Sequence, residues 1–456
     1  MDMAFDDDLK FIRKQRASRP RGRTVEDAWR RIDEDDGLST KDKLQNLISL
    51  TVNKDLGRAS RTGRGGSPQA PAAPAQSLRI FENSYPLHVR YGRISIASGL
   101  QLDRDLVAKL VRASSREDEP EEFDLGRALF IDLETTGLAG GTGTLPFLAG
   151  MGFYRNDRFQ IVQHFLEDPA GEGAFIAGLL RFFKEMDFRS LVTYNGKLFD
   201  LPLLETRFIL NRTAFPLAEL PHLDFLFSAR ILWKHKHESC RLSHLAREVV
   251  QVDRLEDIPS AEIPARYFEY LRTRDFSLIE PILYHNQEDI LSLLGVVISG
   301  FQLIADAESA AAEGAPADAM DLFGAGKFFE RTGDAETSIR YYERALRGRL
   351  SRDTAAAARQ RLSTHFKKAK KFDRAVALWR EMTEADQLAS FRELAMHYEH
   401  RDKNLELALS VSEEGFALAM EEAADSIRED FRHRIERLKA KLRRASAPRP
   451  LKGRTK

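Results

Sequence analysis

The sequence predicts an α/β fold, in which a mixed sheet is flanked by helices, with a disordered N-terminal arm before it and an all-α region after it. Two observations carry this prediction. Between residues 126 and 306, short β-patterned runs come first and then alternate with helical patterns. After residue 318, apolar and aromatic residues recur with helical spacing. At 456 residues, the chain is long enough for two or three domains.

Residues 1–77 are expected to form a disordered, basic, low-complexity arm. The stretch RASRTGRGGSPQAPAAPAQS, at 58–77, is rich in Arg, Gly, Pro and Ala and lacks periodicity, as linkers do. One short amphipathic helix is expected near 39–52. Residues 10–31 carry nine Lys and Arg against two acids, and a second basic tail is expected at 446–456. Such ends are either solvated or add affinity for phosphate groups.

Residues 78–125 are expected to form a strand-rich lead-in, because SLRIFENSYPLHVRYGRISI alternates like paired strands. The next segment, 126–306, begins with three strand-like runs and continues with alternating helices and strands. That is the order of a ribonuclease-H-like fold. Strands are expected at RALFIDLE, FLAGMGFYR, RFQIVQHFL, SLVTYNG and PHLDFL, and helices at 172–185, 199–211 and 280–306.

The C-terminal segment, 318–445, is expected to be a tetratricopeptide-like helical region. Three stretches repeat an aromatic pair followed by a helix with a small, apolar face, and the copies begin about 32–37 residues apart. A generic helical bundle is the alternative. Tyr341, Tyr342 and Trp379 are expected in the helical core rather than on a base-stacking surface.

Composition sets limits on the class of protein. Lys and Arg together number 70, as do Asp and Glu, so no global charge points to nucleic acid or membrane. The single cysteine, Cys240, excludes an intramolecular disulfide framework and favours a reducing, cytoplasmic location. We expect no apolar run of about 18 residues and therefore no membrane span. The acidic start, MDMAFDDDLKF, lacks an apolar signal segment.

Two acids stand in the first predicted strand of the 126–306 segment, in ALFIDLETTGLAGGTGTLPF. Because residues two apart on a strand point to the same face, Asp132 and Glu134 should emerge together. Two carboxylates this close repel each other unless a cation lies between them. Hard divalent ions such as Mg²⁺ and Mn²⁺ prefer carboxylate oxygens. The alternative is a strand end with solvated acids.

Two further segments supply the groups that would complete such a site. Asp200 lies in the first turn of a predicted helix, where an acid also complements the helix dipole. His285 and Asp289 are four residues apart on a later helix and so share one face. Four carboxylates and an imidazole are what a two-metal phosphodiesterase requires. Taken singly, each acid is compatible with an ordinary surface position.

The motifs FIDLETTGL, TYNGKLFDLPLLETRF and YHNQEDILSL resemble the three exonuclease motifs of the DEDD, or DnaQ-like, superfamily of 3′–5′ exonucleases. Similarity is greatest to its YprB-type ribonuclease-H-like branch, in ETTGLAGGTGT, in NGKLFDLPLLETR and in HLDFLFSARILW. It covers residues 126–300. A helical repeat after the nuclease-like domain also occurs in relatives.

The resemblance implies a role for individual residues of this chain. It implies that two divalent ions, Mg²⁺ or Mn²⁺, are bound by four carboxylates, namely Asp132, Glu134, Asp200 and Asp289. It implies contacts to the substrate end from Asn195 and from the backbone of Thr135, Thr136, Gly137 and Leu138. In this superfamily the base is a His five residues before the last Asp or a Tyr four before it. Here those positions hold Tyr284 and His285, and helical phase favours His285 as the base, with Tyr284 in reserve.

The sequence therefore predicts a metal-dependent 3′–5′ exonuclease that acts on nucleic acid, with a single-stranded 3′ end as its substrate. A protein partner is expected at the helical repeats. One alternative is a nucleic-acid-binding protein that does not cut, and another is a docking scaffold built on the repeats. DNA and RNA remain equally open, because acids and backbone groups do not read the 2′-hydroxyl.

Overall fold

The computed structural model describes residues 78–114, 123–137, 143–255, 257–313, 317–422 and 425–446. The expectations for the arm at 1–77, for Leu138 and for the tail from 447 onward lie outside these residues. The chain divides into two compact units. Of the described residues, the first unit contains 78–104, 123–137, 143–225, 241–255 and 257–298, and the second contains the others.

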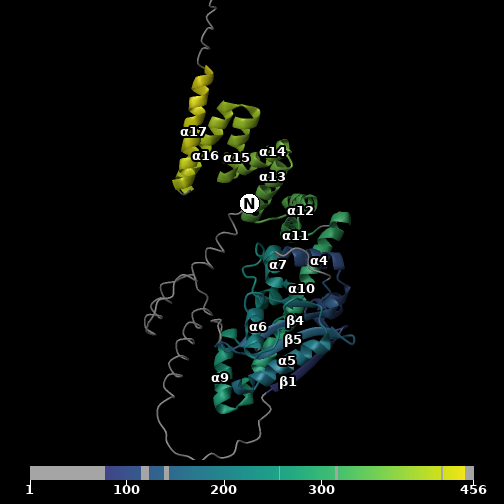
Figure 1. Cartoon of the computed structure of the whole chain (residues 1–456). Helices are drawn as coiled ribbons and strands as arrows, with labels where there is room; N and C mark the ends of the chain where they lie inside the picture. The colour runs from purple at the N-terminus through teal and green to yellow at the C-terminus, as the bar shows by residue number, and fades with distance from the viewer. Residues whose placement is uncertain are drawn as a thin grey trace, which may run out of the picture. The chain divides into compact units, whose positions relative to one another are not determined.

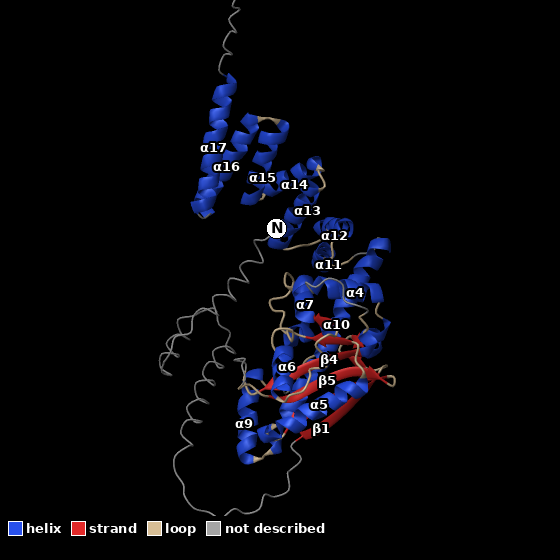
Figure 2. Ribbon diagram, viewed as in Figure 1, coloured by secondary structure: helices blue, strands red, loops and turns tan. Residues whose placement is uncertain are grey.

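A mixed sheet forms the centre of the first unit (Figure 2). Its strand order is β1-β6-β5-β4-β7-β8. The first four strands in that order are antiparallel, and β7 and β8 run parallel to β4. The strands of this sheet are β1 (Leu78–Pro86), β4 (Ala128–Thr135), β5 (Pro146–Arg155), β6 (Arg158–Leu166), β7 (Ser190–Thr193) and β8 (His222–Asp224), and a separate ribbon pairs β2 (Arg90–Tyr91) with β3 (Ile94–Ser95).

The helices of the first unit lie on both faces of this sheet. They are α5 (Glu172–Met186), α6 (Asp200–Leu210), α8 (Leu242–Leu245), α9 (Ile263–Thr273) and the first part of α10 (Glu280–Glu313), with short helical turns η1 (Ile96–Gln101), η2 (Leu125–Arg127), η3 (Pro169–Gly171), η4 (Ala246–Val250), η5 (Ser260–Glu262) and η6 (Phe276–Leu278). Consecutive residues of β6 show which helix covers which face. Gln163 donates a hydrogen bond to the Leu283 carbonyl of α10, whereas the ring of His164 packs on Phe182 of α5. Because neighbouring strand residues point to opposite faces, α5 and α10 cover opposite faces (Figure 1).

Local sequence explains the central hairpin. Strands β5 and β6 are joined at Asn156 and Asp157, whose φ angles are +51° and +54°. Asn and Asp tolerate this left-handed conformation better than other side chains do, and it is the one that tight hairpin turns need. The NDR stretch therefore closes the hairpin expected from the sequence.

Glycines on β5 allow α10 to approach the sheet closely. A Cβ atom at Gly150 would lie 2.0 Å from Asn286 Oδ1, and one at Gly152 would lie 2.4 Å from Ile290 Cγ2. Asn286 and Ile290 are one helical turn apart on α10. The two alternate glycines thus make the flat surface on which the start of α10 packs.

The α/β fold class predicted from the sequence is confirmed, with a mixed sheet, flanking helices and a helical C-terminal region. The segment 78–125, expected as a strand-rich lead-in before the main domain, is partly built into the main sheet. Its first strand, β1, pairs with β6 along Leu78–Pro86 and so belongs to the main sheet. It also contains the helix α4 (Arg104–Ser114), which its strand-like pattern did not predict.

One prediction about apolar runs is wrong. The helical segment Phe276–Ala307 has a mean hydropathy of 1.9 in its most apolar window and is long enough to cross a membrane by length and composition. Within the structure, 78% of that window is buried. Burial of this extent is what a core helix shows, since such a helix is apolar on nearly all sides.

The described second unit is helical. Besides α4 and the remainder of α10, its helices are α7 (Phe225–Trp233), α11 (Ala319–Arg331), α12 (Ala335–Arg347), α13 (Arg352–Lys368), α14 (Phe372–Glu384), α15 (Leu388–His397), η7 (Tyr398–Asp402), α16 (Leu405–Glu422) and α17 (Asp425–Ser446). Side chains of Asp318, Asp334 and Ser351 accept backbone hydrogen bonds at the starts of α11, α12 and α13, as N-caps do. Tyr341, Tyr342 and Trp379 are buried, as expected for core residues. The tetratricopeptide-like character of the region stays a prediction.

Candidate metal and nuclease site

Strand β4 carries Asp132 and Glu134 on the sheet face that α10 covers. Asn286 of α10 donates from Nδ2 to Asp132 Oδ2 at 2.9 Å and to the Asp132 carbonyl at 3.2 Å. Gln163 in turn donates to Asn286 Oδ1 at 2.9 Å, which fixes the orientation of that amide. Between Glu134 and Thr135 the pairing of β4 with β5 shifts register. The two acids therefore lie just before the point where regular pairing ends. Such irregularities in a strand are common next to functional sites.

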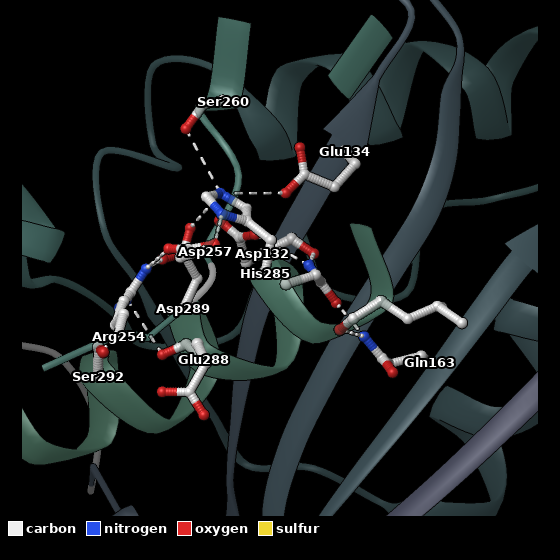
Figure 3. Close-up of polar contacts among 12 residues, drawn as sticks. Asp132, Glu134, Gln163, Arg254, Asp257, Ser260, His285, Glu288, Asp289 and Ser292 are labelled. Carbon is white, nitrogen blue, oxygen red and sulfur yellow. Dashed lines mark hydrogen bonds and ion pairs between the residues drawn. The ribbon is translucent and has the colours of Figure 1, made fainter. Parts of the chain in front are cut away.

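The first turns of α10 bring His285 and Asp289 to the same place (Figure 3). Nε2 of His285 lies 3.8 Å from Glu134 Oε1 and 3.5 Å from Asp289 Oδ2. One ligand atom each from Glu134, His285 and Asp289 lies within 4.8 Å of the others, so these three residues can hold a metal ion. Glu134, His285 and Asp289 are among the residues expected at the site, and the structure brings them together.

The connection between η4 and η5 adds two residues that sequence reasoning missed. Asp257 Oδ1 lies 2.6 Å from Nδ1 of His285. Arg254 Nη1 contacts Asp289 Oδ1 at 2.5 Å and Asp257 Oδ2 at 3.3 Å. Its Nη2 donates to the Glu288 carbonyl and to Ser292. The stretch QVDRLEDIPS has no periodicity and no recognised motif, so nothing in its pattern marked these residues as part of a site.

The pKa shifts show that negative charge predominates at this position. Burial raises the pKa of Asp132 well above its ordinary value, and the charges of Asp289, Glu134 and Asp200 raise it further. Burial alone would lower the pKa of His285, but the hydrogen bond to Asp257 and the charge of Asp289 raise it overall. Both shifts have the sign expected where a cation would relieve repulsion between carboxylates. The donor set of oxygens and one imidazole fits a divalent metal ion.

Asp200 is the first residue of α6, which follows β7. Its charge is among those that raise the pKa of Asp132, so its carboxylate lies near enough to act on that group. Asp200 and Asp132 are outside the tighter set formed by Glu134, His285 and Asp289. Because β7 runs parallel to β4, the start of α6 and the end of β4 lie at the same edge of the sheet, where ligands bind in open α/β folds.

Local hydrogen bonds shape the turn after β4. Thr135 donates from Oγ1 to the Gly137 carbonyl, and the Thr136 side chain accepts from the backbone N–H of Leu145. A Cβ atom at Gly137 would meet no heavy atom of the described residues within 4 Å. Space beside Gly137 is thus free of the other described residues, while Leu138 lies outside them.

Asn195 lies in a turn whose backbone is hydrogen-bonded to a buried carboxylate. Asp224, at the end of β8, accepts from the backbone N–H of Asn195 at 2.7 Å and of Lys197 at 3.0 Å. The φ angle of Asn195 is +68°, a conformation that Asn adopts more readily than most residues. Asp224 therefore sets the shape of the loop that leads to Asp200. Its part in this turn was not foreseen, because the pairing of β8 with β7 is needed to see it.

Tyr284 occupies another face of α10. Its exposed fraction is 36%, whereas that of His285 is 5%. The pKa of Tyr85 is raised to about 12, first by burial and then by the nearby Glu288 and Tyr284. Tyr284 and Glu288 are four residues apart and share a helix face directed toward Tyr85. Of the pair Tyr284 and His285, it is therefore His285 that the structure places beside Glu134 and Asp289.

A match to a known family agrees with this fold. Residues 129–299 match the family RNase_H_2 of the RNase_H superfamily. The uncharacterized protein YprB of Bacillus subtilis (strain 168) is 33% identical over 367 residues, which are 79% of this chain and 86% of YprB. A solved structure of the family B DNA polymerase from the archaeon Pyrobaculum calidifontis aligns with a TM-score of 0.33 at 15% identity, over 50% of this chain and 30% of the polymerase chain. The chain therefore belongs to the family of YprB and carries a ribonuclease-H-like domain.

Proposed function

We propose that this protein is a metal-dependent nuclease that removes nucleotides from the 3′ end of a nucleic acid strand. The observation that carries the proposal is the meeting of Glu134, from a central strand, with His285 and Asp289, from a distant helix, beside Asp132. The match to a superfamily that includes many nucleases supports it. So does the agreement of the three sequence motifs with those of DEDD exonucleases.

Each carboxylate has a proposed part in the reaction. Asp132, Glu134, Asp200 and Asp289 would hold two divalent ions, Mg²⁺ or Mn²⁺. Bound ions of this kind supply Lewis acidity at the scissile phosphate and offset the charge that develops there. The hydrogen bond from Asn286 leaves one oxygen of Asp132 for such an ion. Nε2 of His285 faces oxygens of Glu134 and Asp289, so we assign any role of His285 in the reaction to this atom.

The substrate end is proposed to lie along the turn after β4 and near Asn195. No other described residue lies within 4 Å of a Cβ built at Gly137, so a nucleotide is proposed to approach the backbone of Thr135, Thr136 and Gly137 there. Leu138 would continue this contact. The helical region is proposed to guide the strand or to bind a protein partner, as stacked helical pairs commonly do.

The test is strand cleavage with labelled oligonucleotides. We expect a strand labelled at its 5′ end to shorten stepwise in Mg²⁺ or Mn²⁺, and chelation by EDTA to stop the reaction. Matched DNA and RNA, single- and double-stranded, would define the substrate. Asp289→Asn should reduce the rate by about 100-fold or more, because it removes one charged ligand.

The control variant is Asp157→Asn, the same chemical change at an exposed turn of the same unit. It should cleave like the wild type, because Asn also tolerates the positive φ found there. Binding of strands without any metal-dependent cleavage would contradict the proposal and favour a nucleic-acid-binding protein. Binding of neither strands nor metal would favour a docking scaffold.

A further inference from the structure

The two ring nitrogens of His285 have different surroundings. Nδ1 lies 2.6 Å from Asp257, and an ionised carboxylate only accepts hydrogen bonds, so Nδ1 carries a proton and donates it. Nε2 meets Ser260 Oγ at 3.4 Å, a long contact, and faces oxygens of Glu134 and Asp289. A neutral imidazole with Nδ1 protonated has its lone pair on Nε2. In that tautomer, the lone pair points into the group of carboxylates.

The surroundings of His285 match those of a metal-ligating histidine. Such histidines almost always donate their other N–H to a carboxylate or carbonyl, which fixes the tautomer and the ring orientation. Asp257 takes that place here. Ligating carboxylates are themselves hydrogen-bonded. Arg254 does this for Asp289 by holding Oδ1, so that Oδ2 is the oxygen turned toward His285.

The spacing of the donor atoms fits one shared ion. Ligand atoms bound to one ion at about 2.1 Å lie roughly 3 Å apart when adjacent and roughly 4.2 Å apart when opposite. The separations of Nε2 from Asp289 Oδ2 and from Glu134 Oε1 are 3.5 Å and 3.8 Å. With His285 only 5% exposed, the side chain has little room to turn away.

We infer that His285 is a metal ligand through Nε2, together with Glu134 and Asp289, and that this position takes Mn²⁺ in preference to Mg²⁺. The inference rests on the proposed function and replaces the base role that the sequence analysis gave to His285. Mg²⁺ favours an all-oxygen octahedron, whereas a site with an imidazole favours a transition metal. Asp257 and Arg254 are positioning residues for the two ligands from α10.

The test detects nitrogen bound to manganese directly and needs no substrate. Protein freed of any histidine purification tag is loaded with less than one equivalent of Mn²⁺ and studied by pulsed electron paramagnetic resonance. We expect a ¹⁴N coupling to the Mn²⁺ signal. In wild-type protein grown with ¹⁵N-labelled histidine, the coupling should change to that of ¹⁵N. This second sample requires no substitution, so it does not depend on whether a variant folds.

Variants assign the coupling to one of the 11 histidines of the chain. His285→Gln should abolish it and weaken Mn²⁺ binding by about 100-fold, with a much smaller effect on Mg²⁺. Asp257→Asn should retain the coupling but weaken Mn²⁺ binding by about 10-fold, because the neutral amide makes the imidazole a poorer donor. His88→Gln, at an exposed position of the same unit, should match the wild type in both measurements.

The outcomes separate this inference from the proposed function. Mn²⁺ that binds without nitrogen coupling, alongside metal-dependent cleavage, would overturn the ligand role and leave the nuclease in place. A coupling that survives His285→Gln would place the nitrogen elsewhere and overturn it as well. Failure of Mn²⁺ to bind at millimolar concentration would overturn both. Nitrogen coupling without cleavage would uphold the ligand role alone.

Discussion

At the residue scale, Asp132 shows how the site conflicts with stability. Its carboxylate is partly buried and lies in the field of Asp289, Glu134 and Asp200, with a neutral amide as its hydrogen-bond donor. A carboxylate in this position destabilises the metal-free protein, because both desolvation and repulsion oppose its charge. Bound cations would remove that penalty. A site that lowers stability in this way is common where function requires it.

Substitution of Asp132 should therefore separate stability from function. Asp132→Asn keeps an oxygen that can accept from Asn286 but removes the charge. In EDTA near neutral pH, the variant should be more stable than the wild type by about 1 kcal/mol, or roughly 2–4 °C in Tm. Excess Mn²⁺ should stabilise the wild type more than the variant, because the variant keeps Glu134, His285 and Asp289 but lacks one of the proposed carboxylate ligands. Thermal unfolding followed by circular dichroism measures both.

Asp157→Asn again provides the control, because its carboxylate is exposed in a turn. It should leave Tm unchanged with and without Mn²⁺. If Asp132→Asn destabilised the metal-free protein, repulsion among the carboxylates would not be the dominant effect at this position.

Spacing within one segment indicated which side chains share a face, whereas the grouping of Asp132, Glu134, Asp200 and Asp289 as ligands was implied by the resemblance to exonuclease motifs. Asp132 and Glu134 alternate on a strand, and His285 and Asp289 are one helical turn apart. Arg254 and Asp257 could not be predicted in this way, since they come from an irregular connection with no period. Their role depends on where that connection passes α10, which only the tertiary fold determines.

At the element scale, the packing of α10 on β5 positions the site. Gly150→Ala would place a methyl group 2.0 Å from Asn286 Oδ1 and 2.7 Å from Asn286 Cγ. The side chain of Asn286, and with it its hydrogen bond to Asp132, must then shift, which should cost about 1–3 kcal/mol of unfolding free energy and weaken Mn²⁺ binding. Urea unfolding and Mn²⁺ titration check these effects. Gly143→Ala is the control, because a Cβ there meets no heavy atom of the described residues within 4 Å.

In the second unit, Glu399 joins η7 to α17. This buried side chain accepts from Arg437 and Lys441, each at 2.7 Å. Burial alone would raise the pKa of Glu399, but these hydrogen bonds and charges lower it to about 2. The unfolded chain thus binds a proton that the folded chain does not, between about pH 4.5 and pH 2. Stability from Glu399 is present above that window and is lost as the pH falls through it.

Glu399→Gln should loosen α17 by about 1–3 kcal/mol near neutral pH, because three basic side chains, Arg434, Arg437 and Lys441, lose their charged partner. The difference from the wild type should shrink as the pH falls from about 5 toward 2. Hydrogen exchange of α17 peptides, corrected for intrinsic rates at each pH, measures it. Glu381→Gln, which removes a more exposed partner of Arg359, should change protection little. A difference that did not depend on pH would argue against this account.

Most elements of the first unit could be predicted because their patterns are local. Strands β4, β5 and β6 and helix α5 lie within a residue or two of their expected bounds. The place of β1 could not be predicted, because its partner β6 is about 80 residues away and many registers satisfy the same alternation. Helix α4 was not predicted, because the strand-like alternation of the residues before it was taken to describe the whole segment.

At the scale of the whole molecule, the site draws on segments far apart in the sequence. Strand β4, the start of α6, the connection after η4 and the first turns of α10 each contribute. An ion that binds the folded protein alone stabilises it by about 2.7 kcal/mol at a concentration 100 times its Kd. That stabilisation should be confined to the unit that contains these segments.

Hydrogen exchange mass spectrometry with and without Mn²⁺ tests this confinement. Peptides from β4, from 246–255 and from the start of α10 should gain protection, and peptides from α15, α16 and α17 should not. Uniform protection along the chain would mean that the ion acts at some other place. The variant Asp289→Asn, which removes a ligand of the inferred Mn²⁺ position, should lose most of the Mn²⁺-dependent protection, whereas Asp157→Asn should keep it.

The central claim is that carboxylates from distant segments converge on bound cations. Anomalous X-ray diffraction from crystals soaked in Mn²⁺ tests it most directly, because the manganese signal locates each ion without assumptions about ligands. We predict anomalous peaks within ligand distance of Asp132, Glu134 and Asp289, with His285 Nε2 bound to one of them. Peaks only at other positions, or none at a Mn²⁺ concentration that supports cleavage, would contradict the account.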